Sequence, residues 1–199
     1  MSDITPTRSV VLELKDERRA MDEGYVFLDE KCLLLAGEML RELERHAALE
    51  RDFLAAWDAA VVALQSAVAR HGLEGLQIYP ATALGSAQLR RRPRSLMGVT
   101  LQQAEWVAAS GTPPPGVARS PEAEACRRAF GRLIAQAAPL AAAAGNLERL
   151  RHEYRRAVRR ARALQDVLLP EIDFTVHDLE TRLEELEQED AISMRRAAP

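Results

Sequence analysis

The histidines and cysteines are the side chains best suited to metal binding or nucleophilic catalysis, and their spacing fits neither role. They are far apart in the sequence: the cysteines are Cys32 and Cys126, and the histidines are His46, His71, His152 and His177. No CxxC pair and no Cys/His spacing typical of zinc is present, so we expect two reduced thiols and no metal site. The phosphate-loop, GxGxxG, HExxH and GxSxG motifs are absent as well. The sequence therefore predicts a protein that is not an enzyme and has no catalytic, cofactor or metal site.

Arginines form two clusters whose chemistry is binding rather than catalysis. Arg90, Arg91, Arg92 and Arg94 lie in the middle of the chain, and Arg159, Arg160 and Arg162 lie near its end. The first cluster is compatible with a solvated loop, a contact for a partner protein or a phosphate-binding patch. The second is compatible with a solvated helix face or a contact track for a partner. Because the formal net charge is −3 and acidic residues flank both clusters, we expect no nucleic-acid partner.

Two long heptad-patterned segments must position these side chains. The first covers residues 7–71, from a cap at Thr7 to a stop at His71-Gly72, and would be roughly 95 Å long as a helix. The second covers residues 146–196. Large apolar residues recur in steps of three and four, as at Met39, Leu43, Phe53, Trp57 and Leu64 in the first segment. This narrow seam, in a chain rich in Ala and Leu with only 5% aromatic residues, is typical of a coiled coil.

The two seams predict an antiparallel pair with a defined register. Leu14 would face Leu186, Met21 would face Leu179, Leu28 would face Ile172 and Phe53 would face Leu147, so that the residue numbers in each pair add to 200. The charges favour the same orientation, because Arg18 and Arg19 would lie near the acidic residues 180–187.

The residues between the two segments predict a small head. Residues 72–119 hold most of the glycines and prolines, and β-prone runs at Leu76–Tyr79 and Leu96–Leu101 suggest a hairpin with the first arginine cluster between its strands. The triplet Pro113-Pro114-Pro115 suggests polyproline character. A short helix over residues 120–138 would start at Ser120-Pro121 and break or bend near Pro139. Pro170 predicts a kink inside the last helix. The fold class is mainly α, as a single domain.

Three stretches resemble the D subunit of the V-type and A-type rotary ATPases, over nearly the whole chain. The opening Pro6-Thr7-Arg8, with Gly24 and Phe27–Lys31, is similar to that family's start. Met97-Gly98-Val99 resembles its MGV triplet, and Arg159–Pro170 followed by the acidic Leu183–Glu189 resembles its C-terminal segment. Asp29-Glu30, Cys32 and Arg162 depart from the family pattern, as expected of a divergent bacterial member.

The resemblance implies a central rotor stalk, or axle, that couples ATP hydrolysis or synthesis to ion translocation. It implies A and B subunits of the catalytic hexamer around the termini, a small F-type stalk subunit along the shaft, and a funnel-shaped membrane-rotor subunit near the head. The candidate contact residues for these subunits are Arg18, Arg19, Lys31, Met97, Gly98, Val99, Arg159, Arg160, Arg162, Pro170 and Arg182.

The sequence also bears on location and on an alternative function. The N-terminus lacks the layout of a signal peptide, and the apolar stretch from Leu133 to Ala144 is too short to span a bilayer. We therefore expect a cytoplasmic protein, peripheral to the membrane and without direct membrane insertion. The alternative function is a stand-alone coiled-coil scaffold or holdase, which would self-associate through its own seam.

Overall fold

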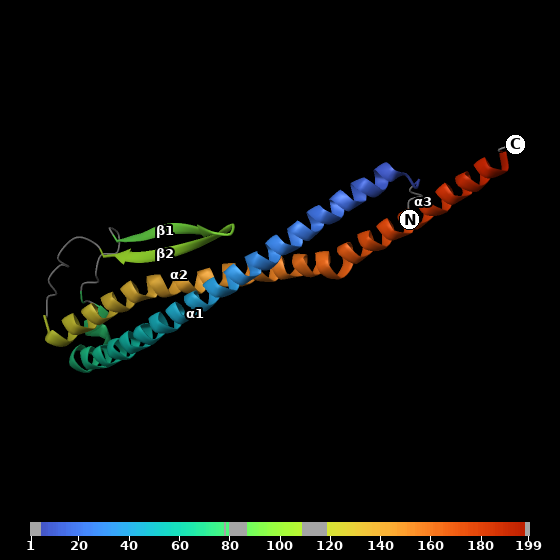
Figure 1. Ribbon diagram of the computed structural model, residues 1–199. Coiled ribbons are helices and arrows are strands. Elements are labelled where there is room, and N and C mark those ends of the chain that lie inside the picture. The colour runs from blue at the N-terminus through green and yellow to red at the C-terminus, as the bar shows by residue number, and fades with distance from the viewer. Residues whose placement is uncertain (1–4, 78, 80–86, 109–118, 198–199) are drawn as a thin grey trace. The chain divides into compact units, whose positions relative to one another are not determined.

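The computed structural model describes residues 5–77, 79, 87–108 and 119–197, and within them the protein is mainly α (Figure 1). Its elements are helix α1 (Arg8–Gln77), strands β1 (Gln88–Leu96) and β2 (Val99–Val107), helix α2 (Pro121–Ala163), a π-helix (Leu164–Leu168) and helix α3 (Leu169–Ala197). Two long helical segments with a two-stranded antiparallel sheet between them in the sequence confirm the predicted fold class. The polyproline triplet at 113–115 lies outside the described residues.

Helix α1 begins and breaks where the sequence predicts. The Val10 N–H donates to Thr7 Oγ1 at 3.3 Å, and the Val11 N–H donates to the Thr7 carbonyl at 3.2 Å, which satisfies two amides of the first turn. At the other end Gly72 has φ 69° and ψ 170°, a conformation that residues with a Cβ rarely adopt. Helical backbone then resumes as far as Gln77, so the strand expected at Leu76–Tyr79 is wrong.

Helix α2 starts at its predicted cap but runs much further than predicted. Ser120 Oγ accepts a hydrogen bond from the Ala123 N–H at 3.1 Å, and Pro121 is the first helical residue, where it needs no donor. The helix continues through Pro139 to Ala163, so the break near Pro139 and the separate short helix over 120–138 are wrong. A proline removes one hydrogen bond from a helix, and α2 continues through this loss.

The irregularity predicted at Pro170 takes the form of a π-helical turn. Residues Leu164–Leu168 form this turn directly before the proline, and the Leu169 N–H donates to the Leu164 carbonyl, five residues back. A proline lacks a donor for the carbonyl four residues before it and clashes with that carbonyl, here of Asp166. The wider π-turn is a known way for a helix to absorb such a defect. The predicted kink therefore has a defined backbone basis.

The chain forms two compact units, and the single domain expected from the sequence stays a prediction. Unit 1 consists of Met1–Leu34 with Tyr154–Pro199, and unit 2 consists of Leu35–Glu153. In unit 1, Val11 packs with Ile172, Val176 and Leu179 in the core between α1 and α3. In unit 2, Ala60 of α1 packs with Ala129 and Leu133 of α2. Small alanines at this contact allow the two helix backbones of unit 2 to approach closely.

Both units pair their helices antiparallel, but in another register than predicted. In unit 1, Lys15 binds Glu180 rather than facing Glu185, and Arg18 binds Asp173 rather than facing Arg182. In unit 2, Glu42 contacts Asn146 rather than facing Val158. The displacement is thus between five and twelve residues, or one to three helical turns. A heptad pattern repeats every seven residues, so a register slipped by one repeat, which lies within this range, again places apolar residues opposite apolar residues.

Candidate interaction surfaces

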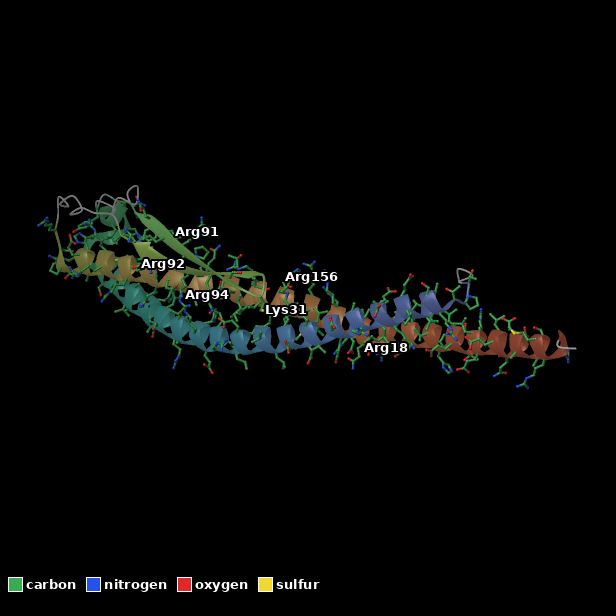
Figure 2. The ribbon with its side chains drawn as sticks, turned by 45° about the horizontal axis from the view of Figure 1, so that its top comes forward. Arg18, Lys31, Arg91, Arg92, Arg94 and Arg156 are labelled. Atoms are coloured by element: carbon green, nitrogen blue, oxygen red, sulfur yellow. The ribbon has the colours of Figure 1, made fainter. Side chains whose placement is uncertain are left out.

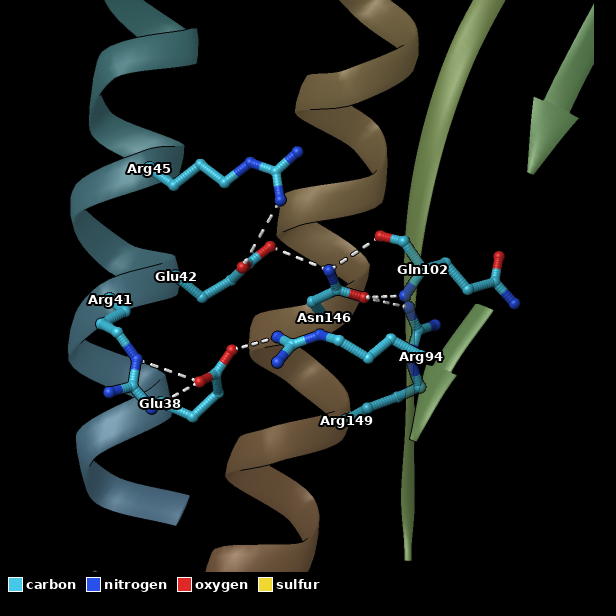
Figure 3. Close-up of polar contacts among 8 residues, drawn as sticks. All are labelled: Glu38, Arg41, Glu42, Arg45, Arg94, Gln102, Asn146 and Arg149. Atoms are coloured by element: carbon cyan, nitrogen blue, oxygen red, sulfur yellow. Dashed lines mark hydrogen bonds and ion pairs between the residues drawn. The ribbon is translucent and has the colours of Figure 1, made fainter. Parts of the chain in front are cut away.

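A buried polar cluster holds the hairpin against both helices of unit 2 (Figure 3). At its centre is Asn146 of α2, which is only 2% exposed. Its Oδ1 accepts hydrogen bonds from the Gln102 N–H and from Arg149 Nη2, both at 2.7 Å. Its Nδ2 donates to Glu42 Oε1 at 2.8 Å and to the Gln102 carbonyl at 2.9 Å. All four hydrogen-bonding positions of the carboxamide are therefore used.

The contact with Gln102 explains why an asparagine occupies this position. Hydrogen-bonded and non-hydrogen-bonded pairs alternate along an antiparallel hairpin, and Gln102 and Pro93 form a non-hydrogen-bonded pair. The Gln102 N–H and carbonyl therefore point away from β1, and both bind Asn146. The carboxamide of Asn146 has the same donor and acceptor as a peptide group, so it binds the main chain of β2 as a neighbouring strand would. The hairpin is thereby fixed to α2 through its backbone. Sequence reasoning missed this role, because a lone asparagine in a helix carries no recognisable signal.

A second set of contacts in the same cluster fixes strand β1 to α1. Glu38, which is 5% exposed, accepts a hydrogen bond from Arg41 Nη2 at 2.6 Å and one from Arg94 of β1. Burial is the largest influence on the pKa of Glu38 and acts to raise it, but the hydrogen bonds from the two arginines outweigh burial. The pKa of Glu38 is therefore held below its usual value, and the carboxylate stays charged.

The turn of the hairpin explains the Met97-Gly98-Val99 triplet in structural terms. Met97 and Gly98 have positive φ angles of 48° and 84° and form the two-residue turn between Leu96 and Val99. Two positive φ angles are typical of a type I′ turn, whose twist matches that of the strands. Gly98 adopts this conformation freely, whereas Met97 does so at a cost of about 1 kcal/mol. Val99 is buried. The role of this triplet as a partner contact remains a prediction.

The first arginine cluster lies in strand β1, not in a loop between strands. Figure 2 shows Arg91, Arg92 and Arg94 along the hairpin. Side chains alternate between the faces of a strand, so Arg90, Arg92 and Arg94 share one face and Arg91 lies on the other. Arg94 is paired with Glu38. Within the described residues the side chains of Arg90, Arg91 and Arg92 are exposed and form no hydrogen bond or ion pair.

The contact residues predicted in unit 1 differ in how far their charges are already neutralised. Three of them are paired: Arg18 with Asp173, Arg19 with Asp16 at 3.7 Å, and Arg182 with Asp178 at 3.0 Å. Lys31 also has an interaction within the chain. By contrast Arg159, Arg160 and Arg162, at the end of α2, are exposed and have no partner in the described part of the chain. Pro170 is exposed at the start of α3.

Helix α1 of unit 2 carries an exposed apolar strip, three of whose residues the sequence analysis placed in the seam. Its large residues are exposed to between 39% and 64% and comprise Leu40, Leu43, Leu54, Trp57 and Leu64. Together with Ala47, Glu50 and Val61, these residues follow one another along α1 in alternating steps of three and four, which is the spacing of one heptad seam. The predicted seam residues Leu43, Trp57 and Leu64 are therefore not the core of unit 2. The core uses the adjacent face with Glu42, Ala60 and Ala67.

One stretch of the same helix is unusually apolar. Helix α1 contains an 18-residue window that, judged by length and composition alone, could cross a membrane. Only 11% of that window is buried. A core helix of a soluble protein would be mostly buried, so this surface is suited to a further partner. Contiguous exposed apolar surface of this kind typically marks an interaction site.

The described residues contain no group of three or more His, Cys, Asp or Glu side chains placed to hold a metal ion. Cys32 and Cys126 are free thiols, and burial raises the pKa of both. A raised pKa lowers the fraction of reactive thiolate, so neither cysteine has the environment of a nucleophile.

The fold and these surfaces define a class: a protein of paired long helices with a docked β-hairpin, whose exposed groups are suited to binding other proteins. A family model described as the D subunit of ATP synthase matches residues 10–198. The V-type ATP synthase D subunit of Thermotoga neapolitana is 25% identical over 97% of this chain and 96% of its own length. The A-type ATP synthase D subunit of Pyrococcus abyssi is 25% identical over 97% of this chain and 92% of its own length. The chain belongs to the family of ATP synthase D subunits, which confirms the resemblance.

Proposed function

We propose that this protein is the central rotor stalk subunit of a V-type or A-type rotary ATPase. In this role it is not an enzyme itself and couples ATP hydrolysis or synthesis in the A/B hexamer to ion translocation in the membrane sector. The observation that carries the proposal is the family match from residue 10 to residue 198, which includes both helical units and the hairpin. Relatives named as the D subunit of a V-type or A-type ATP synthase support it.

The apolar strip of unit 2 is the proposed contact for the small F-type stalk subunit. Heptad spacing with exposed Leu40, Leu54 and Trp57 is suited to the apolar face of a partner helix. Trp57, half exposed in the free chain, is the residue expected to contribute most, because tryptophans dominate the energetics of many interfaces.

The paired helices of unit 1 are the proposed contact for the A and B subunits. A shaft that rotates inside a hexamer needs contacts that can be exchanged at each step. Exposed ion pairs such as Arg8–Glu187 and Lys15–Glu180 are worth at most about 1 kcal/mol each. Arg159, Arg160 and Arg162, which have no partner among the described residues, are the strongest candidates for a charged contact with the hexamer.

The hairpin turn is the proposed contact for the funnel-shaped membrane-rotor subunit. Met97 adopts a backbone conformation that an asparagine or glycine would adopt more readily. A role for the methionine side chain in a partner contact would account for its presence there. Under this proposal the protein is cytoplasmic and peripheral to the membrane, and the apolar surface of α1 is covered by protein rather than lipid.

Reconstitution tests the proposed function directly. The purified chain should form a one-to-one complex with the F-type subunit and should raise the ATPase activity of an A/B hexamer. Trp57→Ala should weaken the F-type complex by at least tenfold without reducing helicity, because the side chain is half exposed. Val62→Ala is a matched control, since Val62 is an exposed apolar residue of α1 outside the heptad positions of the strip.

The competing function is a stand-alone scaffold or holdase. In that case the isolated chain should form homo-oligomers of fixed size in sedimentation, and Trp57→Ala should dissociate them. Failure to bind either the F-type subunit or the hexamer, together with such self-association, would require the rotor proposal to be dropped.

A further inference from the structure

A small cationic pocket lies between the hairpin and α1 in unit 2. It has a volume of about 150 Å³ and is lined by Arg45 of α1, Arg90 and Arg92 of β1, and Gln103, Ala104 and Glu105 of β2. Its polar groups come from three elements that the Asn146 cluster holds together: Gln102, next to Gln103, is bound to Asn146, and Arg94, two residues after Arg92, is bound to Glu38. The pocket walls are therefore fixed by buried contacts.

The charges of the pocket are only partly balanced by the protein. Arg45 has a single ion pair, with Glu42, at the long distance of 4.0 Å. The side chains of Arg90 and Arg92 have no hydrogen bond or ion pair to any described residue. Glu105 is opposite Arg90 in the strand pairing, and the structure shows no ion pair between the two within the described chain. Three arginines and one glutamate leave a net charge of +2 on the lining.

We propose that this pocket binds a phosphate group through Arg45, Arg90 and Arg92. A phosphate dianion matches the net charge of the lining, and guanidinium groups bind phosphate oxygens with paired, charge-assisted hydrogen bonds. The pocket is small, about 150 Å³, a size that suits a phosphate group. The carboxamide of Gln103 supplies a neutral donor beside the three arginines.

The phosphate has two possible sources, a free inorganic ion or the terminal phosphate of a nucleotide whose remaining part stays outside the pocket. The arginines would bind the phosphate group in the same way in both cases. Titration with inorganic phosphate and with ADP distinguishes the two sources. Comparable affinities indicate the free ion, and a clearly tighter complex with ADP indicates the nucleotide.

The alternating faces of strand β1 provide a matched control for the test. Arg90→Ala/Arg92→Ala removes two guanidinium groups from the pocket, whereas Arg91→Ala removes one from the same strand on the opposite face. All three side chains are exposed and without partners in the described chain, so the variants should fold like the parent, which circular dichroism checks. Lysines at 90 and 92 keep the charge but lose the paired hydrogen bonds.

Calorimetric titration of the full chain with inorganic phosphate, at constant ionic strength, measures the site. We expect saturable binding that is weakened roughly tenfold or more by Arg90→Ala/Arg92→Ala, weakened by the two lysines, and unchanged by Arg91→Ala. Glu105→Gln should tighten binding, since it removes the one negative charge of the lining. The proposal is overturned if no saturable binding is found, if Arg91→Ala weakens binding as much as the double variant, or if acetate competes as well as phosphate.

Discussion

Replacing Asn146 by alanine should detach the hairpin from the helices of unit 2. The substitution removes four hydrogen bonds, all between 2.7 and 2.9 Å. It leaves the Gln102 N–H, the Gln102 carbonyl and the Glu42 carboxylate without this partner. Arg149 Nη2 also loses its acceptor, but Arg149 is partly exposed to water and is left out of the sum. A buried polar group that loses its partner costs between about 1 and 3 kcal/mol. Gln102 is only partly buried and Arg45 stays within 4.0 Å of Glu42, so we take the low end, about 3 kcal/mol in total.

Two measurements locate the loss in unit 2. Urea unfolding followed by the fluorescence of Trp106 in β2, in a Trp57→Phe background, should show a lower midpoint for Asn146→Ala. Hydrogen exchange should show faster exchange of the Gln102 amide, because its only hydrogen bond in the described structure is to Asn146. A decrease of about 3 kcal/mol in the free energy of local opening corresponds to a roughly 100-fold faster exchange of this amide.

Two further variants separate this explanation from a general loss of packing. Asn146→Asp keeps the acceptor for the Gln102 N–H but loses both donors and places a carboxylate beside Glu42, so it should destabilise at least as much at neutral pH. Gln103→Ala, next to Gln102 with an exposed side chain, should change stability by less than about 0.5 kcal/mol. The reasoning is refuted if Asn146→Ala leaves both the midpoint and the Gln102 exchange rate unchanged.

Three other outcomes follow from single features of the fold. Gly98→Ala should lower hairpin stability by about 1 kcal/mol, seen in the unfolding midpoint, because a Cβ meets no atom within 4 Å and only the positive φ opposes it; an unchanged midpoint would contradict the turn assignment. The pKa of Glu38 is lowered in the folded state. Its contribution to the free energy of unfolding is therefore fully present above the pKa of the carboxylate in the unfolded chain, and it is lost as the pH falls through the pKa in the folded state. Glu38→Gln should therefore lower stability at neutral pH and flatten the acid limb of the stability–pH curve, whereas an unchanged slope would argue against the ion pairs. Pro139→Ala should stabilise its helix by up to about 3 kcal/mol, and Pro170→Ala by less, because the π-turn already accommodates that proline; equal gains in thermal unfolding would show that the π-turn has no such effect.

Local backbone chemistry could be predicted from the sequence, and the structure bears it out. Thr7 and Ser120 cap their helices, Gly72 interrupts α1, and Pro170 follows an irregular turn. Each of these features depends on the φ/ψ preference or hydrogen-bonding capacity of one residue and its near neighbours. The same is true of the mainly helical character, since Ala and Leu at helical spacing favour helix with or without tertiary contacts.

The arrangement of the hairpin could not be predicted in this way. Arg90, Arg91 and Arg92 are in strand β1 despite their polarity, because the hairpin is fixed by its turn and by contacts with α1 and α2. Those contacts depend on Glu38, Glu42 and Asn146, which are distant in sequence and individually unremarkable. A buried carboxylate or carboxamide is acceptable only when its partners are present, and the partners come from other elements.

The sequence by itself determined that this chain forms long antiparallel helices with heptad spacing and belongs with the D subunits of rotary ATPases. Only the tertiary structure decided which face of α1 is buried and in which register the helices pair. The physical reason is that a heptad pattern specifies the interval between apolar residues but not their partner. The close packing of alanines in unit 2 and the saturated hydrogen bonds of Asn146 select one register. That choice leaves the strip with Leu40 and Trp57 exposed for a partner.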